Sequence, residues 1–97
     1  MKGVWIFELD RFGYDLFVVG KTKEEVEHAM KAEYIRAYAK INELDEDTMR
    51  LALEFPVADE DGEVDEDNPY NEFVRYYNTT FEDNEPHFYE FGKVEWQ

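Results

Sequence analysis

The chain has no cysteine and no serine, and it holds only 10 basic residues against 25 acidic ones. Without cysteine there can be no disulfide or thiolate metal site, which fits a reducing compartment. Threonines and tyrosines are the only hydroxyl nucleophiles left, and no motif brings His28 and His87 together. No GxGxxG, P-loop or HExxH motif occurs. We therefore predict a protein without catalytic residues, cofactor or metal site.

Long apolar runs are also missing. Acidic residues appear from Glu8 onward, and no later stretch approaches the roughly eighteen apolar residues of a membrane span. We therefore expect a cytoplasmic protein. What is abundant is apolar bulk, because 43% of the 97 residues are hydrophobic and 18% are aromatic. This composition predicts a folded chain, and its length predicts a single domain over residues 1–97.

The net charge of -15 is concentrated in one part of the chain. Residues 1–42 hold seven acidic and seven basic residues, whereas residues 43–97 hold eighteen acidic and three basic residues. An adaptation to high salt would spread acidic residues over the whole surface, so the asymmetry favours a local purpose.

The charge-balanced part predicts a hairpin followed by a helix. The segments Val4–Leu9 and Tyr14–Val19 are aromatic and β-branched, with Gly13 at the turn between them. Thr22 and Glu25 have the spacing of a capping box, which predicts a helix from there to about Ile41.

Two apolar strips run along this expected helix. The first is predicted to pack on the sheet and consists of Val26, Met30, Tyr34, Ala37 and Ile41. The second, on nearly the opposite side, consists of Ala32, Ile35 and Ala39. A later segment of the chain or a second copy of the protein, forming a homodimer, would cover this second strip.

The acidic part predicts shorter elements. Apolar residues alternate over Met49–Phe55, which predicts a half-buried strand, and residues 56–68 form an acidic loop. Asn68 and Pro69 have the order of an N-cap and a first helical residue, so a short helix follows, with a strand as the alternative. A last strand is expected over residues 87–96, with a bulge at Gly92. The fold class is α+β, in the order ββαβ(α)β, with an antiparallel sheet and one main helix on a face.

The acidic loop region carries eight carboxylates between Glu54 and Asp67. One interpretation is a calcium site, because Asp59, Asp61 and Asp65 take ligand positions of an EF-hand loop if Gly62 is its sixth residue. The first and the last, bidentate ligands of such a loop are absent. A second interpretation is a solvated loop without a function.

The third interpretation is that the carboxylates imitate nucleic-acid phosphates. Alternate residues of an extended segment lie about 6.6 Å apart on one side, near twice the axial spacing of phosphates along a DNA strand. Further acidic residues cluster before and after this loop, and neighbouring tyrosines are suited to interface anchoring. The residues predicted to bind a partner are Glu43, Asp45, Glu46, Asp47, Asp59, Glu60, Asp61, Glu63, Asp65, Glu66, Asp67, Tyr70, Tyr76, Glu82, Asp83 and Glu85.

In size, charge and loop placement the chain resembles the small acidic inhibitors of phages and mobile elements, the anti-CRISPR and anti-restriction DNA mimics. The resemblance implies a partner with a basic nucleic-acid-binding surface. Direct binding of nucleic acid is disfavoured because like charges repel. The alternative hypothesis is a small non-catalytic adaptor that binds through Ala32, Ile35 and Ala39 while its acidic loop is only solvated.

Overall fold

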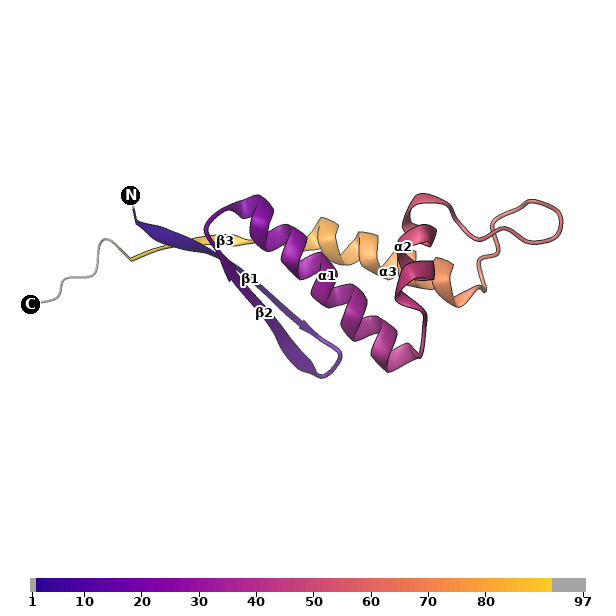
Figure 1. Ribbon diagram of the computed structural model, residues 1–97, viewed down its shortest axis with the longest axis horizontal. Coiled ribbons are helices and arrows are strands. Elements are labelled where there is room, and N and C mark those ends of the chain that lie inside the picture. Colours follow the sequence, from indigo (N-terminus) through magenta and orange to yellow (C-terminus); the bar gives the residue numbers. More distant parts are fainter. Residues whose placement is uncertain (1, 92–97) are drawn as a thin grey trace, which may run out of the picture. The chain divides into compact units, whose positions relative to one another are not determined.

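The computed structural model describes residues 2–91, and these divide into two compact units (Figure 1). The sheet unit contains residues up to Glu33 and from Asn84 onward, and the helical unit is Tyr34–Asp83. The elements along the chain are β1 (Gly3–Arg11), β2 (Tyr14–Gly20), α1 (Lys23–Asn42), α2 (Glu46–Glu54), α3 (Pro69–Asp83) and β3 (His87–Glu90). The predicted α+β class is confirmed, and α1 continues from one unit into the other.

The predicted hairpin is present and is closed by a two-residue turn. Arg11 pairs with Tyr14, so only Phe12 and Gly13 lie between the strands. Both have positive φ, 61° at Phe12 and 79° at Gly13, which is the conformation of a type I′ turn. This turn matches the twist of the two strands and sets their register.

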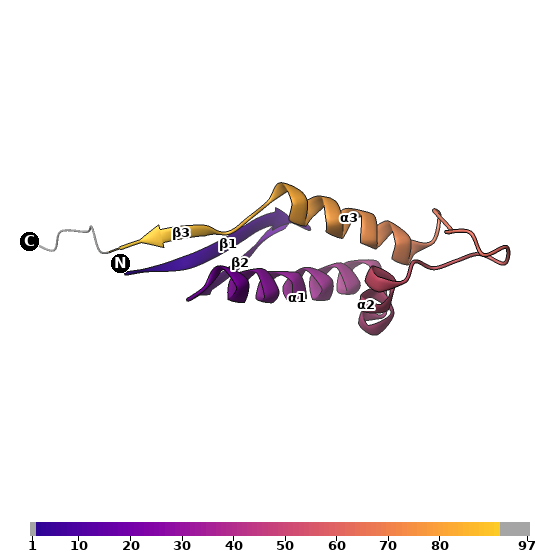
Figure 2. The same cartoon turned by 90° about the horizontal axis from the view of Figure 1, so that it is seen from above.

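The sheet has the order β2-β1-β3 and is antiparallel throughout. Phe7 and Leu9 on β1 are buried, as is Leu16 on β2, which pairs with Leu9. Val26 and Met30, in the first half of α1, have no exposed surface. This part of α1 lies along the sheet (Figure 2), so these side chains form the core of the sheet unit.

The start of α1 is capped much as the sequence predicts. The hydroxyl oxygen of Thr22 accepts a hydrogen bond from the backbone N–H of Glu25 at 3.1 Å. The Glu25 carboxylate accepts from the backbone N–H of Lys21, also at 3.1 Å, and not from that of Thr22. Two backbone donors at the helix start are thereby satisfied.

Aromatic rings form the core of the helical unit. Tyr34 on α1 contacts Tyr77 and Phe81 on α3, with ring centroids 6.0 and 5.6 Å away. Tyr38, one turn later on α1, contacts Phe73 at 5.2 Å. The contacts run in opposite order along the two helices, so this half of α1 and α3 are antiparallel.

The two predicted apolar strips of α1 are largely buried. Val26, Met30, Tyr34 and Ala37 are buried as expected, whereas Ile41 at the end of the first strip is 51% exposed. On the second strip, Ile35 and Ala39 are buried with 5% and 6% exposure, and Ala32 is half-buried. This burial within one chain favours the alternative in which the chain itself covers the strip.

The predicted strand over Met49–Phe55 is wrong, because these residues belong to α2 and the residue that ends it. Met49 and Ala52, three residues apart, are the buried ones, whereas Leu51 is 58% and Phe55 66% exposed. The alternation of apolar residues therefore does not describe a buried face. The deciding signal is local: Asp45 caps the helix and acidic residues fill its first turn.

The helix predicted after Pro69 is confirmed and is longer than expected, at 15 residues. The side chain of Asn68 accepts from the backbone N–H of Tyr70 at 2.9 Å, as an N-cap does. The last strand is confirmed for His87–Glu90, and the predicted bulge at Gly92 lies outside the described residues. Within the described chain, every helix is too short or too polar to cross a membrane.

The turn of the hairpin allows a test of the backbone alone. A Cβ atom added at Gly13 would meet no atom within 4 Å, so a side chain there meets no steric clash. We expect Gly13→Ala to lower the free energy of unfolding by about 1 to 2 kcal/mol, because alanine disfavours positive φ. Urea denaturation followed by circular dichroism measures this change. An unchanged midpoint would contradict the type I′ assignment.

Candidate functional site

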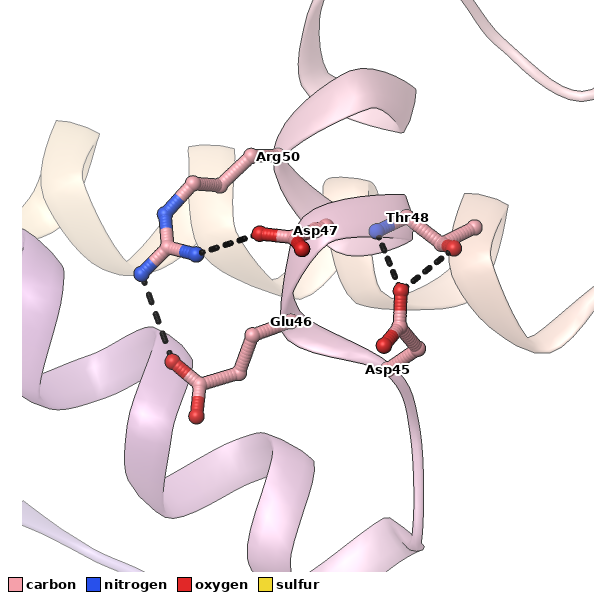
Figure 3. A network of polar contacts seen from close by, with 5 residues as sticks. All are labelled: Asp45, Glu46, Asp47, Thr48 and Arg50. Atoms are coloured by element: carbon pink, nitrogen blue, oxygen red, sulfur yellow. Dashed lines mark hydrogen bonds and ion pairs between the residues drawn. The ribbon is translucent and has the colours of Figure 1, made fainter.

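The first acidic cluster consists of Glu43, just after α1, and Asp45–Asp47 at the start of α2; Figure 3 shows Asp45, Glu46 and Asp47. The carboxylate of Asp45 accepts from the backbone N–H of Thr48 at 2.9 Å and from its hydroxyl at 2.7 Å. Both hydrogen bonds lower the pKa of Asp45 because they favour the ionised form, and the bond from the Thr48 hydroxyl has the larger effect. Asp45 is thus ionised and fixed in place.

One basic side chain serves two acidic residues in this cluster. Arg50 lies 3.3 Å from the Glu46 carboxylate and 3.5 Å from that of Asp47 (Figure 3). The Asp47 side chain is 97% exposed, so its ion pair is well screened by solvent. A single positive charge leaves the cluster of four acidic residues negative.

The tip of the acidic loop is a compact turn. The Asp59 side chain accepts from the backbone N–H groups of Asp61 and Glu63, at 2.9 and 3.0 Å. Ala58 and Val64 form a bridge across the base of this turn, and Gly62 has a φ of 82°. The loop tip is therefore held by its own backbone and by one of its carboxylates.

The phosphate interpretation assumed an extended segment, and the structure contradicts that assumption for the alternate residues Asp59, Asp61, Glu63, Asp65 and Asp67. Turns interrupt the segment at residues 60–61 and 66–67. The Asp65 side chain accepts from the backbone N–H of Asp67 at 3.1 Å, as that of Asp59 does within its own turn. The carboxylates are therefore presented by folded turns and do not follow the even spacing of a strand.

Asn71 on α3 fastens the base of the loop. Its side-chain oxygen accepts from the backbone N–H of Val57 at 3.0 Å. Its amide nitrogen donates to the carbonyl oxygens of Val57 and Asp65, at 2.9 and 2.7 Å. One half-buried side chain thus joins both ends of the loop to the first turn of α3.

Tyr70 connects the loop to the first cluster. Its hydroxyl accepts from the backbone N–H of Asp45 at 3.1 Å, while its own N–H donates to Asn68 at the end of the loop. The first cluster and the acidic loop therefore meet at one end of the helical unit. We call this combined region, Glu43–Asp47 with residues 56–68, the acidic end (Figure 1).

The third predicted cluster is separate from the acidic end. Glu82 and Asp83 lie in the last turn of α3, about 21 Å along the helix from Pro69. Glu85 belongs to the sheet unit. Two of the three expected acidic segments are thus brought together by contacts within one unit.

The loop carboxylates face solvent without counter-charges. Six of the seven are exposed, and Asp65 is half-buried. Among the described residues, no basic side chain forms an ion pair with them. The described part of the chain also contains no group of three acidic or histidine residues arranged to hold a metal ion.

Several acidic residues occupy positions where they cost stability. Glu43 has a φ of 56° at the end of α1, where Leu44 donates its N–H to the Ala39 carbonyl at 3.0 Å, as in a Schellman motif. Glycine is favoured at this position. Glu54 ends α2 and Asp83 ends α3, although helix C-termini favour cations. These helices have no basic residue in their last turn.

Apolar side chains lie beside the acidic residues. Leu51, Phe55 and Val64 are 58%, 66% and 55% exposed. The alternation of apolar residues placed Leu51 and Phe55 on the buried face of a strand, so their exposure was not expected. The acidic residues that precede Met49 were the signal that could have identified this segment as a helix. Tyr76, predicted as an anchor, is 52% exposed, and Tyr70 is half-buried.

The tyrosines of the aromatic core are kept neutral. Burial, with a smaller contribution from the Glu72 carboxylate, raises the pKa of Tyr38 to about 12. Burial also raises the pKa of Tyr77. Both effects disfavour the phenolate, so these hydroxyl groups add no negative charge and are unsuited to act as bases.

Comparison with known proteins gives no guide to this surface. No family model matches the chain, and the comparisons with curated proteins and with solved structures found no match. What the acidic end can do therefore has to be argued from its charge, exposure and hydrogen bonding.

The role of Asn71 leads to a prediction about the loop. Asn71→Asp removes the two N–H donors and places a carboxylate against two carbonyl oxygens. We expect the free energy of unfolding to fall by about 2 kcal/mol, since buried acceptors lose their partners. Limited proteolysis should also cut the variant faster within residues 56–68.

Asn78→Asp is the matched control. Asn78 is exposed on the same helix, and its replacement by aspartate adds the same negative charge. Equal destabilisation in the two variants would show that Asn71 acts through charge alone and does not fasten the loop.

Proposed function

We propose that this protein is an acidic interaction protein that inhibits a partner by occupying its basic nucleic-acid-binding surface. The observation that carries the proposal is the loop of the acidic end, which is braced by hydrogen bonds. Six of its seven carboxylates are exposed, and none of the seven forms an ion pair among the described residues. Lysine and arginine side chains that grip phosphates would be attracted to such a surface. Because hydrogen bonds already hold the loop in place, it loses less conformational entropy on binding.

The uneven charge supports this proposal. The helical unit holds fifteen acidic and four basic residues, a net charge of -11. Glu43, within the acidic end, keeps a carboxylate in a left-handed backbone conformation that favours glycine. Retaining charge at positions that cost stability is expected where the charge has a function.

The exposed apolar residues give the proposed surface a second component. Leu51 on α2 and Phe55, the residue that ends α2, belong to the same unit as the carboxylates, and Val64 lies within the loop itself. Desolvated apolar anchors usually supply most of the binding energy, while charges set encounter rate and specificity. A partner that places apolar groups among its lysines and arginines would fit best.

The adaptor hypothesis has less support. It requires a partner to reach the strip formed by Ala32, Ile35 and Ala39. Ile35 and Ala39 are 5% and 6% exposed, so only their edges are accessible in this conformation. An adaptor that used a different surface would still be insensitive to competing nucleic acid, which gives the clearest way to separate the two proposals.

The stability cost of the misplaced charges can be measured. We expect Glu43→Gly to raise the free energy of unfolding by about 1 kcal/mol, because it relieves the left-handed backbone. Asp83→Lys should add about 0.5 kcal/mol through the helix dipole. Glu24→Lys, in the first turn of α1, is the control and should have the opposite sign. Urea denaturation at low ionic strength measures all three variants.

Failure of Glu43→Gly to stabilise the protein would contradict the argument that Glu43 is retained for binding. The inhibitor proposal would then rest on the loop alone.

Removing charge from the loop tests binding directly. The variant Glu60→Gln, Asp61→Asn, Glu63→Gln and Asp67→Asn removes four charges whose side chains take no part in the hydrogen bonds of the turns. Tagged wild-type protein should capture nucleic-acid-binding proteins from a cell extract, and excess duplex DNA should release them. For a purified captured partner, the variant should bind roughly tenfold more weakly or worse, mainly through slower association.

A matched control removes four charges from the sheet unit and α1. It carries Glu8→Gln, Asp10→Asn, Glu24→Gln and Glu27→Gln, and it should bind the partner like the wild type. If the loop variant binds as tightly as the wild type and DNA fails to release the partner, the protein is not a nucleic-acid mimic.

A further inference from the structure

Among the described residues, β2 lies at an edge of the sheet and has no strand paired to its outer side. In the order β2-β1-β3, both β2 and β3 lie at edges, and β2 is the longer of the two, with seven residues against four. Proteins usually blunt exposed edges with lysine, proline, bulges or very short strands. The strand β2, YDLFVVG, has neither lysine nor proline, and its pairing with β1 runs without a bulge.

The hairpin register determines which backbone groups are free on this edge. In a two-residue hairpin the closing pair, here Arg11 and Tyr14, exchanges hydrogen bonds with each other, and hydrogen-bonded pairs then alternate along the strands. The N–H and C=O groups of Asp15, Phe17 and Val19 therefore point away from β1. They are available to another strand.

The side chains of the same residues are also exposed. Phe17 is 58% and Val19 51% exposed, and they lie on the face opposite Phe7 and Leu9, because their partners on β1 are Glu8 and Ile6. Asp15 and Lys21, at either end of this segment, are exposed as well. The segment thus has an acidic start, an apolar centre and a basic end.

We propose that two copies of the chain pair antiparallel through their β2 strands, with Val18 opposite Val18 of the second copy. In this register Phe17 lies opposite Val19 of the second copy, and by symmetry Val19 lies opposite its Phe17. Asp15 lies opposite Lys21 of the second copy, and the symmetry of the dimer produces this pair twice. The sheets of the two copies join into one sheet of six strands, related by a two-fold axis.

This register satisfies three independent requirements. It pairs the residues whose backbone N–H and C=O groups point away from β1, as a hydrogen-bonded ladder requires. About four backbone hydrogen bonds then form between Phe17 and Val19 of the two copies. It buries the exposed apolar side chains against each other. It also places opposite charges across the interface. The neighbouring register with Phe17 opposite Phe17 meets the first two requirements but leaves Asp15 facing valine and Lys21 beyond the ladder.

Lys21 contributes only its side chain to this interface. It lies one residue past the end of β2, and its backbone N–H already donates to Glu25 at 3.1 Å. The long side chain reaches the Asp15 position without requiring its own backbone to join the ladder. A cross-strand pair of opposite charge contributes modestly, and two such pairs occur in the symmetric dimer.

The charge distribution favours a second copy as the occupant. An unrelated strand would need a basic residue opposite Asp15 and an acidic residue opposite Lys21. A second copy, paired antiparallel, provides both by symmetry. The sheet unit has ten acidic and six basic residues, so its net charge of -4 opposes self-association less than the -11 of the helical unit. This inference does not depend on the proposed inhibitory function.

Sedimentation velocity on the whole chain tests the proposal at about 0.15 M ionic strength, where screening is physiological. Over about a hundredfold range of concentration the wild type should change from monomer to dimer and go no further. A chain that stays monomeric throughout this range, or that forms larger assemblies, would overturn the proposal.

Charge reversal tests the register. Asp15→Lys and Lys21→Glu each place like charges opposite each other twice, so each should weaken the dimer about tenfold. The double variant Asp15→Lys with Lys21→Glu restores both pairs in exchanged positions and should dimerise like the wild type. An equal mixture of the two single variants should form the mixed dimer.

Two controls complete the design. Lys40→Glu makes the same charge change in the last turn of α1, which belongs to the helical unit, and should leave the dimer unchanged. Circular dichroism checks that each variant retains the fold, which exposed substitutions should do. If the single variants dimerise as strongly as the wild type, or if neither the double variant nor the mixture restores the dimer, the β2 pairing is wrong.

Discussion

The helical unit depends on the packing of aromatic rings between α1 and α3. Tyr34 and Tyr38 contact Phe73, Tyr77 and Phe81, and this burial offsets the repulsion within a unit of net charge -11. The same packing fixes α3, whose first turn carries the residues that fasten the acidic loop and contact the cap of α2. Apolar packing along one stretch of helix thus positions the charged surface.

Strong local signals made much of the fold predictable. Thr22 and Glu25 mark the start of α1, and Asn68 with Pro69 marks the start of α3, because capping depends on residues only a few positions apart. The hairpin is local in the same way: alternating apolar residues and Gly13 suffice to define it.

The incorrect predictions come from two kinds of information that local patterns do not carry. The segment Met49–Phe55 alternates like a strand, yet the capping carboxylate of Asp45 and contacts with α3 make it a helix. In the loop, the side chains of Asp59 and Asp65 bend the chain through hydrogen bonds with their neighbours. The acidic residues of the candidate site were identified correctly as a group, but their geometry depends on the distant Asn71.

Carboxylates therefore do two different things in this molecule. Asp45, Asp59 and Asp65 accept backbone N–H groups and shape the chain. The side chains of Glu60, Asp61, Glu63 and Asp67 accept none among the described bonds and contribute mainly charge. The division explains why amide substitutions at the second group are the sharper test of charge: they leave the hydrogen bonds of the turns in place.

The strand β3 returns to β1 only after the whole helical unit has been traversed. Trp5 pairs with Phe88, more than eighty positions later, whereas β1 and β2 are joined by two residues. Bringing such distant residues together costs chain entropy, and this cost falls when the intervening segment is already compact. The order of assembly is thereby constrained. The hairpin can form by itself, but the third strand gains from a helical unit that has folded first, which couples the folding of the two units.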